Sequence, residues 1–150
     1  MDKTAIIKKI LSNESYILGA IIFVVSAWFC FFNINQELQQ SDEAIHMTVV
    51  QQMHQNGHYL VPISRGDKLY LNKPPLKMWL TLPLIKVFGD YNFSYRLLDA
   101  SVGVLFFLLV FVLGKNLFNS WWVGAIASFY LLGNVKLFGN HIFRSATQDS

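Results

Sequence analysis

The sequence predicts an all-α membrane protein with about three transmembrane helices and two amphipathic surface helices in the first outer loop. Hydrophobic residues make up 53% of the 150 residues and charged residues only 14%, a balance that disfavours a soluble domain. Apolar stretches occupy about residues 15–36, 93–113 and 116–135. Each is close to the roughly 20 residues that a helix needs to cross the hydrocarbon core. Most of the polar residues gather in a loop of about residues 37–92.

Charge and cysteine content exclude several classes of protein. A net charge of +3, without interleaved basic and aromatic residues, gives no indication of nucleic-acid binding. Cys30 is the single cysteine and lies in an apolar run. It therefore has no partner for an internal disulfide or a CxxC metal site, and it does not indicate a redox compartment.

The first apolar stretch follows a basic amphipathic segment that contains Lys3, Lys8 and Lys9. A signal peptide is the alternative, but its apolar region is about 7–15 residues long and is followed by small residues at a cleavage site. Large residues at 28–32 occupy that place here. We therefore predict an uncleaved span with its lysines in the cytoplasm and the loop of residues 37–92 outside, although this long loop is itself basic.

The loop contains two predicted helices that are too short and too polar to span. Ile45, Val49 and Met53 recur at helical spacing, which predicts a helix over residues 41–55 that Gly57 ends. Residues 58–72 are predicted as a loop with turns. A second surface helix is expected over residues 76–87, after two prolines.

The second span carries charges where it begins. Arg96 and Asp99 are three residues apart on one face of the helix, where they can pair with each other. A turn over residues 114–120 leads into the third span, whose core is residues 121–135. This topology places Asp42, Lys73 and Asp149 on the same side of the membrane.

Several polar residues have both a structural and a functional interpretation. Asp42 and Glu43 fall in the first turn of their helix, where a carboxylate contributes about 0.3–1 kcal/mol through the helix dipole alone. Lys73 beside its prolines can be a snorkelling lysine. His46 lies one turn after Asp42, so the two can share a metal ion, although a surface hydrogen bond explains the same spacing.

An ordered set of motifs resembles the N-terminal part of a family of membrane glycosyltransferases. That family includes the bacterial aminoarabinose transferases that modify lipid A in the cell envelope and the protein O-mannosyltransferases. The matching residues are Asp42-Glu43, Met53, Gly57, Pro62, Gly66, Tyr70, Lys73-Pro74-Pro75-Leu76, Trp79, Phe88-Gly89, Phe93 and Arg96. The resemblance begins at Asp42; the residues before it match only in forming a membrane span.

The resemblance implies a GT-C architecture and a set of site residues. Asp42, Glu43 and Asp149 are then expected to be catalytic, and Lys73, Tyr70 and Arg144 to bind substrate. The donor is a polyprenyl-phosphate-linked sugar, the acceptor is a lipid or a protein, and transfer inverts the anomeric centre. The enzyme is multi-pass in the inner (plasma) membrane, with its site toward the periplasm or exterior. The cofactor stays unknown, with a divalent metal as one option.

Elementary chemistry agrees with these roles. A carboxylate can orient an acceptor or take its proton, and a lysine can neutralise a departing phosphate. The sequence has no glycine-rich loop of the kind that binds soluble nucleotides. Because members of the family are several times longer, we expect the chain to be part of a longer enzyme or a truncated product, inactive by itself.

Two other classes of membrane protein compete with this hypothesis. The first is a small three-span scaffold or subunit without chemistry, in which Asp42 and Lys73 tolerate substitution. The second is part of a transporter. Transporters usually carry charges or broken helices near the membrane midplane, whereas the charges here lie at the ends of the spans.

Overall fold

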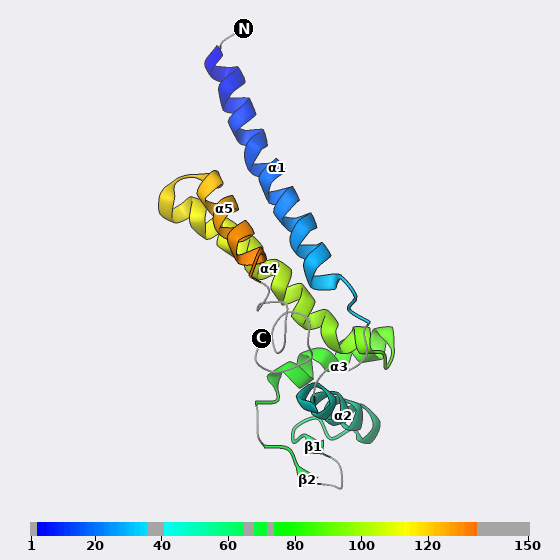
Figure 1. Cartoon of the computed structure of the whole chain (residues 1–150). Helices are drawn as coiled ribbons and strands as arrows, with labels where there is room; N and C mark the ends of the chain where they lie inside the picture. The colour runs from blue at the N-terminus through cyan, green and yellow to red at the C-terminus, as the bar shows by residue number, and fades with distance from the viewer. Residues whose placement is uncertain (1–2, 36–40, 65–67, 72–73, 135–150) are drawn as a thin grey trace.

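The computed structural model describes residues 3–35, 41–64, 68–71 and 74–134 of the 150-residue chain. The described part is helical except for one short hairpin (Figure 1). Its elements are α1 (Lys3–Phe31), α2 (Ser41–Asn56), β1 (Ile63–Ser64), β2 (Lys68–Leu69), α3 (Leu76–Phe88), α4 (Asn92–Phe118) and α5 (Trp121–Leu132). An all-α fold is therefore correct at the level of class.

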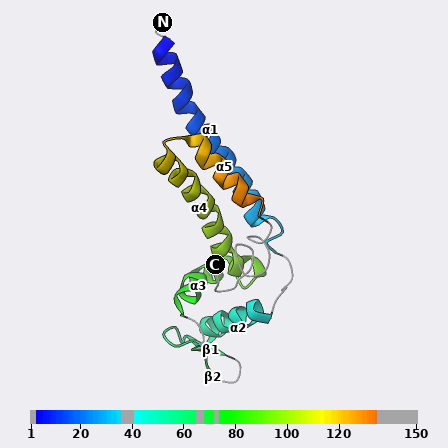
Figure 2. The ribbon, with the colours of Figure 1, turned by 60° about the vertical axis from the view of Figure 1, so that its left-hand side comes forward.

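The molecule is elongated and has two parts. The helices α1, α4 and α5 run side by side, while α2, α3 and the hairpin lie at the end where α1 finishes and α4 begins (Figures 1 and 2). Within the described residues, two helices are long and apolar enough to cross a membrane, over Asn13–Phe31 and Asn92–Phe118. The 12 residues of α5 cover only about 18 Å at 1.5 Å per residue, which is short of the hydrocarbon thickness.

The first helix differs from its predicted bounds at both ends. The basic lead-in and the apolar stretch form one continuous helix from Lys3, because no glycine or proline separates them. The helix ends at Phe31, before the predicted limit at residue 36. Asn33 follows with a φ of 60°, a left-handed conformation that asparagine tolerates better than most residues.

The turn between α4 and α5 also lies later than predicted. Helix α4 continues through Gly114 to Phe118, and the chain reverses at Asn119, whose φ is 52°. Gly114 permits a close helix crossing: a Cβ at this position would lie 2.4 Å from the Cα of Gly124. Small residues at a crossing bring two backbones together, as in many membrane helix pairs.

The helices in the two parts of the molecule enclose separate apolar cores. The first core lies among α1, α4 and α5, and the second lies among α2, α3, the hairpin region and the start of α4. The first contains Leu18, Ile22, Cys30, Ala100, Val104, Phe107, Phe111, Ala125 and Leu132. The second contains Met47, Val49, Val50, Met53, Tyr70, Met78, Leu82, Ile85 and Tyr95.

The two loop helices match their predictions to within one residue. Helix α2 covers Ser41–Asn56 and α3 covers Leu76–Phe88. The glycines that follow them, Gly57 and Gly89, have φ values of 72° and 89°, which glycine adopts without a Cβ penalty. The segment predicted as a plain loop contains the antiparallel pair β1–β2, which the sequence analysis missed.

Candidate functional site

The candidate site begins at the first turn of α2, where adjacent acids have opposite environments. Asp42 is exposed to solvent, whereas the Glu43 side chain is only 1% exposed. Successive residues of an α-helix point about 100° apart, so neighbours can face the core and the solvent. The two acids are adjacent in sequence, but in the fold Asp42 faces solvent and Glu43 faces the interior.

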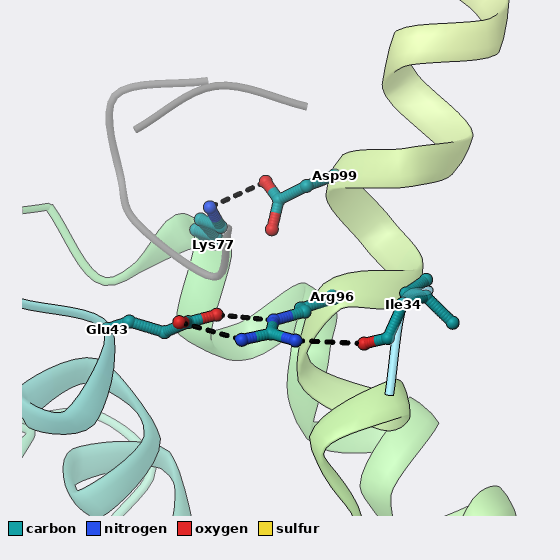
Figure 3. Close-up of polar contacts among 5 residues, drawn as sticks. All are labelled: Ile34, Glu43, Lys77, Arg96 and Asp99. Atoms are coloured by element: carbon teal, nitrogen blue, oxygen red, sulfur yellow. Dashed lines mark hydrogen bonds and ion pairs between the residues drawn. The ribbon is translucent and has the colours of Figure 1, made fainter. Parts of the chain in front are cut away.

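Arg96 from α4 binds Glu43 through two parallel hydrogen bonds (Figure 3). Its Nε donates to Oε1 of Glu43 at 2.5 Å, and its second terminal nitrogen donates to Oε2 at 2.9 Å. The Arg96 side chain is 3% exposed. This two-point geometry fixes the direction of both side chains, which a single contact would leave free to rotate.

The same guanidinium also holds the segment after α1. Its remaining terminal nitrogen donates to the backbone carbonyl of Ile34 at 3.0 Å (Figure 3). One side chain of α4 therefore connects the end of α1 to the start of α2. This three-way contact sets the position from which the neighbouring Asp42 side chain reaches solvent.

A second ion pair joins α3 to α4 one turn further along. The Nζ of Lys77 lies 2.6 Å from Oδ1 of Asp99, which is almost fully buried (Figure 3). Arg96 and Asp99 therefore bind opposite charges on two facing helices, which differs from the local pair that their spacing allows. Both side chains are buried.

Tyr70 and His46 belong to the packed interior beneath α2. Their rings meet edge to face with centroids 5.8 Å apart, and both side chains are buried. The backbone N–H of Tyr70 donates to the carbonyl of Pro62 at 2.8 Å, which extends the hairpin pairing. Tyr70 stays a predicted substrate-binding residue, although this ring is mostly covered by the described part of the chain.

The metal hypothesis pairs residues with different environments. His46 is buried, whereas Asp42 is exposed. In the described ranges, no group of three or more His, Cys, Asp or Glu side chains lies close enough together to hold a metal ion. The described residues therefore supply no third ligand for a metal ion at His46 and Asp42.

Three predicted site residues lie outside the described part of the chain: Lys73, Arg144 and Asp149. The structure adds three that the sequence analysis did not assign to the site: Arg96, Lys77 and Asp99. The sequence did contain a signal for Arg96 and Asp99, because charged residues at the start of a long apolar helix are costly unless they are paired. The sequence did not identify their partners.

Comparison with known proteins gives limited information. No family model and no solved structure match the chain. An uncharacterized protein of Aquifex aeolicus (strain VF5) is 27% identical over 91 residues, which are 60% of this chain and 18% of that protein. The chain thus spans less than a fifth of the length of this relative.

Proposed function

We propose that this chain forms part of a membrane glycosyltransferase that moves a sugar from a polyprenyl-phosphate-linked donor to a lipid or protein acceptor. In this proposal three transmembrane segments, the third including α5, anchor the outer segment that carries the site. Asp42 is the general base or acceptor-orienting group on the outer face of the membrane.

The observation that carries the proposal is the contrast between Asp42 and Glu43. An exposed carboxylate on a free helix end would move with that end. Here the adjacent Glu43 is bound at two points by Arg96, which also binds the Ile34 carbonyl. Asp42 is therefore accessible to a substrate while its backbone is held by buried polar contacts, as a positioned catalytic group requires.

The proposed reaction is a direct displacement at the anomeric carbon. An acceptor oxygen forms a bond to that carbon while the bond to the donor phosphate oxygen breaks, and the departing phosphate takes the electron pair. If the acceptor is a hydroxyl, its proton passes to the Asp42 carboxylate. A phosphate acceptor needs orientation rather than deprotonation. Lys73, Arg144, Tyr70 and Asp149 are proposed to complete the substrate contacts.

An apolar groove beside Lys77 supports a lipid-linked donor. The groove has a volume of about 190 Å³ and is lined by Lys77 and Asp99 together with Leu76, Leu80, Leu98 and Val102. Its apolar walls suit the isoprenoid chain of such a donor. Asp99 balances the charge of Lys77 in the same groove, so the cation that stabilises the leaving phosphate is proposed to be Lys73 or Arg144.

The test of this function is Asp42→Asn in the longest reading frame that contains this chain. We expect transfer from a polyprenyl-phosphate sugar to fall by about 10²–10⁴-fold, the usual loss when a general base is removed. Membrane levels of the protein should not change, because Asp42 is exposed and its role is separate from the Glu43–Arg96 contact.

Asp90→Asn is the matched control for loss of an exposed acid. Asp90 accepts hydrogen bonds from the Tyr95 hydroxyl at 2.5 Å and from Nε2 of Gln51 at 2.6 Å. Asparagine can keep both contacts, because its oxygen can accept from Gln51 while its NH2 group donates to the Tyr95 hydroxyl oxygen. This variant should retain most of the transferase activity. Near-normal turnover by Asp42→Asn would instead leave Asp42 as a helix-terminal acid and remove the basis of the proposal.

A further inference from the structure

A second groove lies at the opposite end of the molecule, between α1 and the α4–α5 pair. It has a volume of about 610 Å³ and is open on one side. The residues lining it are mainly apolar and aromatic: Ser15, Tyr16, Gly19, Ala20, Phe23, Leu108, Phe111, Val112 and Trp121. This volume is within the range of roughly 300–1,000 Å³ that small-molecule sites occupy.

A lysine lies at the edge of this groove. Lys115 follows Phe111 and Val112 by four and three residues, so it shares their face of α4. Its Nζ lies 5.7 Å from the centroid of the Trp121 ring, and it also donates to Oδ1 of Asn119. The cation is thus held next to an aromatic wall of the groove.

The cation that the described side chains place at this groove is Lys115. The sequence before Ser15 is also basic, with Lys3, Lys8 and Lys9 against Asp2 and Glu14.

We propose that this groove binds an anionic phospholipid, with an acyl chain along its apolar wall and the headgroup at Lys115. The inference rests on insertion of α1 and α4 in the bilayer, but it does not depend on glycosyl transfer. The groove offers apolar surface for an acyl chain, and Lys115 at its edge offers a positive charge for the phosphate. The charge selects the anionic headgroup over a zwitterionic one.

This site differs from ordinary lipid contact with a helix surface. A lipid that only surrounds the protein contacts convex surface and exchanges without regard to its headgroup. The groove instead offers three helix walls, and Trp121 lies against Phe111 with ring centroids 5.1 Å apart. The proposal therefore predicts two separable properties: retention by the groove and selectivity by Lys115.

The experiment is native mass spectrometry of the full 150-residue chain, delipidated in detergent and titrated with phosphatidylglycerol or phosphatidylcholine of identical acyl chains. Phosphatidylglycerol should be retained about fivefold better, the effect expected from one lysine near an anionic headgroup. Lys115→Gln should remove this selectivity. Ala20→Phe, which fills the groove from α1, should reduce retention of both lipids.

Two control variants test whether the effects belong to the groove. Lys86→Gln removes a lysine that lies 5.0 Å from the centroid of the Tyr59 ring at the other end of the molecule, and selectivity should survive it. Ile17→Phe enlarges an exposed residue of α1 that does not line the groove, and retention should survive it. Circular dichroism of each variant checks that the helices are retained.

Three outcomes would overturn the proposal. The first is equal retention of the two lipids by the unaltered chain, and the second is equal loss with Lys86→Gln and Lys115→Gln. The third is a lipid-free dimer that Ala20→Phe dissociates and Ile17→Phe does not. That result would assign the groove to a second copy of the chain.

Discussion

The neighbours Asp42 and Glu43 have the same chemistry but different physical roles. Glu43 is buried and bound by Arg96, so its charge is balanced by a cation and its side chain is fixed. Asp42 is open to solvent. A carboxylate can exchange a proton with a substrate only where the substrate can reach it, so the exposed acid is the one suited to catalysis.

The Glu43–Arg96 pair predicts strong energetic coupling between two distant residues. Arg96→Met should lower the free energy of unfolding by about 3–5 kcal/mol, because it leaves the buried Glu43 charge without its guanidinium. The double variant Glu43→Leu/Arg96→Met should lose less than the sum of the two single variants, since it leaves neither charge behind. Denaturant unfolding in detergent micelles, followed by circular dichroism, measures all three.

Lys86→Met is the control for this cycle. Lys86 is exposed, and its Nζ lies 5.0 Å from the centroid of the Tyr59 ring, so its loss should change stability by less than about 1 kcal/mol. Additive losses in the Glu43 and Arg96 variants would mean that the two side chains do not stabilise each other.

The sequence identified these charged residues but not their partners. Arg96 and Asp99 are close in sequence, so their spacing favours a local pair. The structure pairs Arg96 with a residue 53 positions earlier and Asp99 with Lys77 on α3. Such partners depend on how the helices pack, and helical periodicity gives only the face on which a residue lies.

At the scale of elements, the closest contact is the crossing of α4 and α5. A Cβ on Gly124 would lie 2.1 Å from the carbonyl oxygen of Phe111, far inside contact distance. The Ser128 hydroxyl donates to the carbonyl of Phe107 at 3.0 Å, one turn along the same interface. Close backbone approach and this buried hydrogen bond hold α5 against α4.

Gly124→Ala should therefore weaken the helix pair. The added methyl group forces the backbones apart, and overpacking of this kind typically costs about 1–3 kcal/mol. Thermal unfolding in detergent should show a lower midpoint for this variant.

Gly133→Ala is the matched control, because its added Cβ would lie 3.5 Å from the nearest neighbour, the carbonyl oxygen of Tyr130. Its φ of −71° suits alanine, so the midpoint should hardly move. Equal stability of Gly124→Ala and the unaltered chain would show that α4 and α5 cross less closely than described.

Sequence patterns predicted some elements better than others. The bounds of α2 and α3 were accurate because apolar spacing and a following glycine coincide there. The predicted turn over residues 114–120 begins too early, because α4 continues through Gly114 to Phe118. Gly114 instead allows α5 to pack closely against α4. A single sequence does not show whether a glycine ends a helix or allows such a close crossing.

On the scale of the whole molecule, the two ends have different chemistry. One end holds the Glu43–Arg96 and Lys77–Asp99 pairs, while the opposite end holds the α4–α5 turn and the start of α1 (Figure 2). If α1 and α4 cross a bilayer, these ends face opposite compartments. The lysines of α1 predict that the second end is cytoplasmic.

Single cysteines at the two ends test this topology in intact cells. Cys30 is buried, and Cys30→Ala removes it as a background thiol with little change in side-chain volume. In that background, Leu60→Cys places a thiol at a position that is 84% exposed beside the hairpin. Asn116→Cys places a thiol on an exposed position near the α4–α5 turn.

An impermeant maleimide should label Leu60→Cys in intact cells and Asn116→Cys only after lysis, because the bilayer separates the two ends. Labelling in the reverse order would place Asp42 in the cytoplasm, where the proposed polyprenyl-phosphate donor site would face the wrong compartment. Labelling of both before lysis would contradict a membrane-spanning arrangement of α1 and α4.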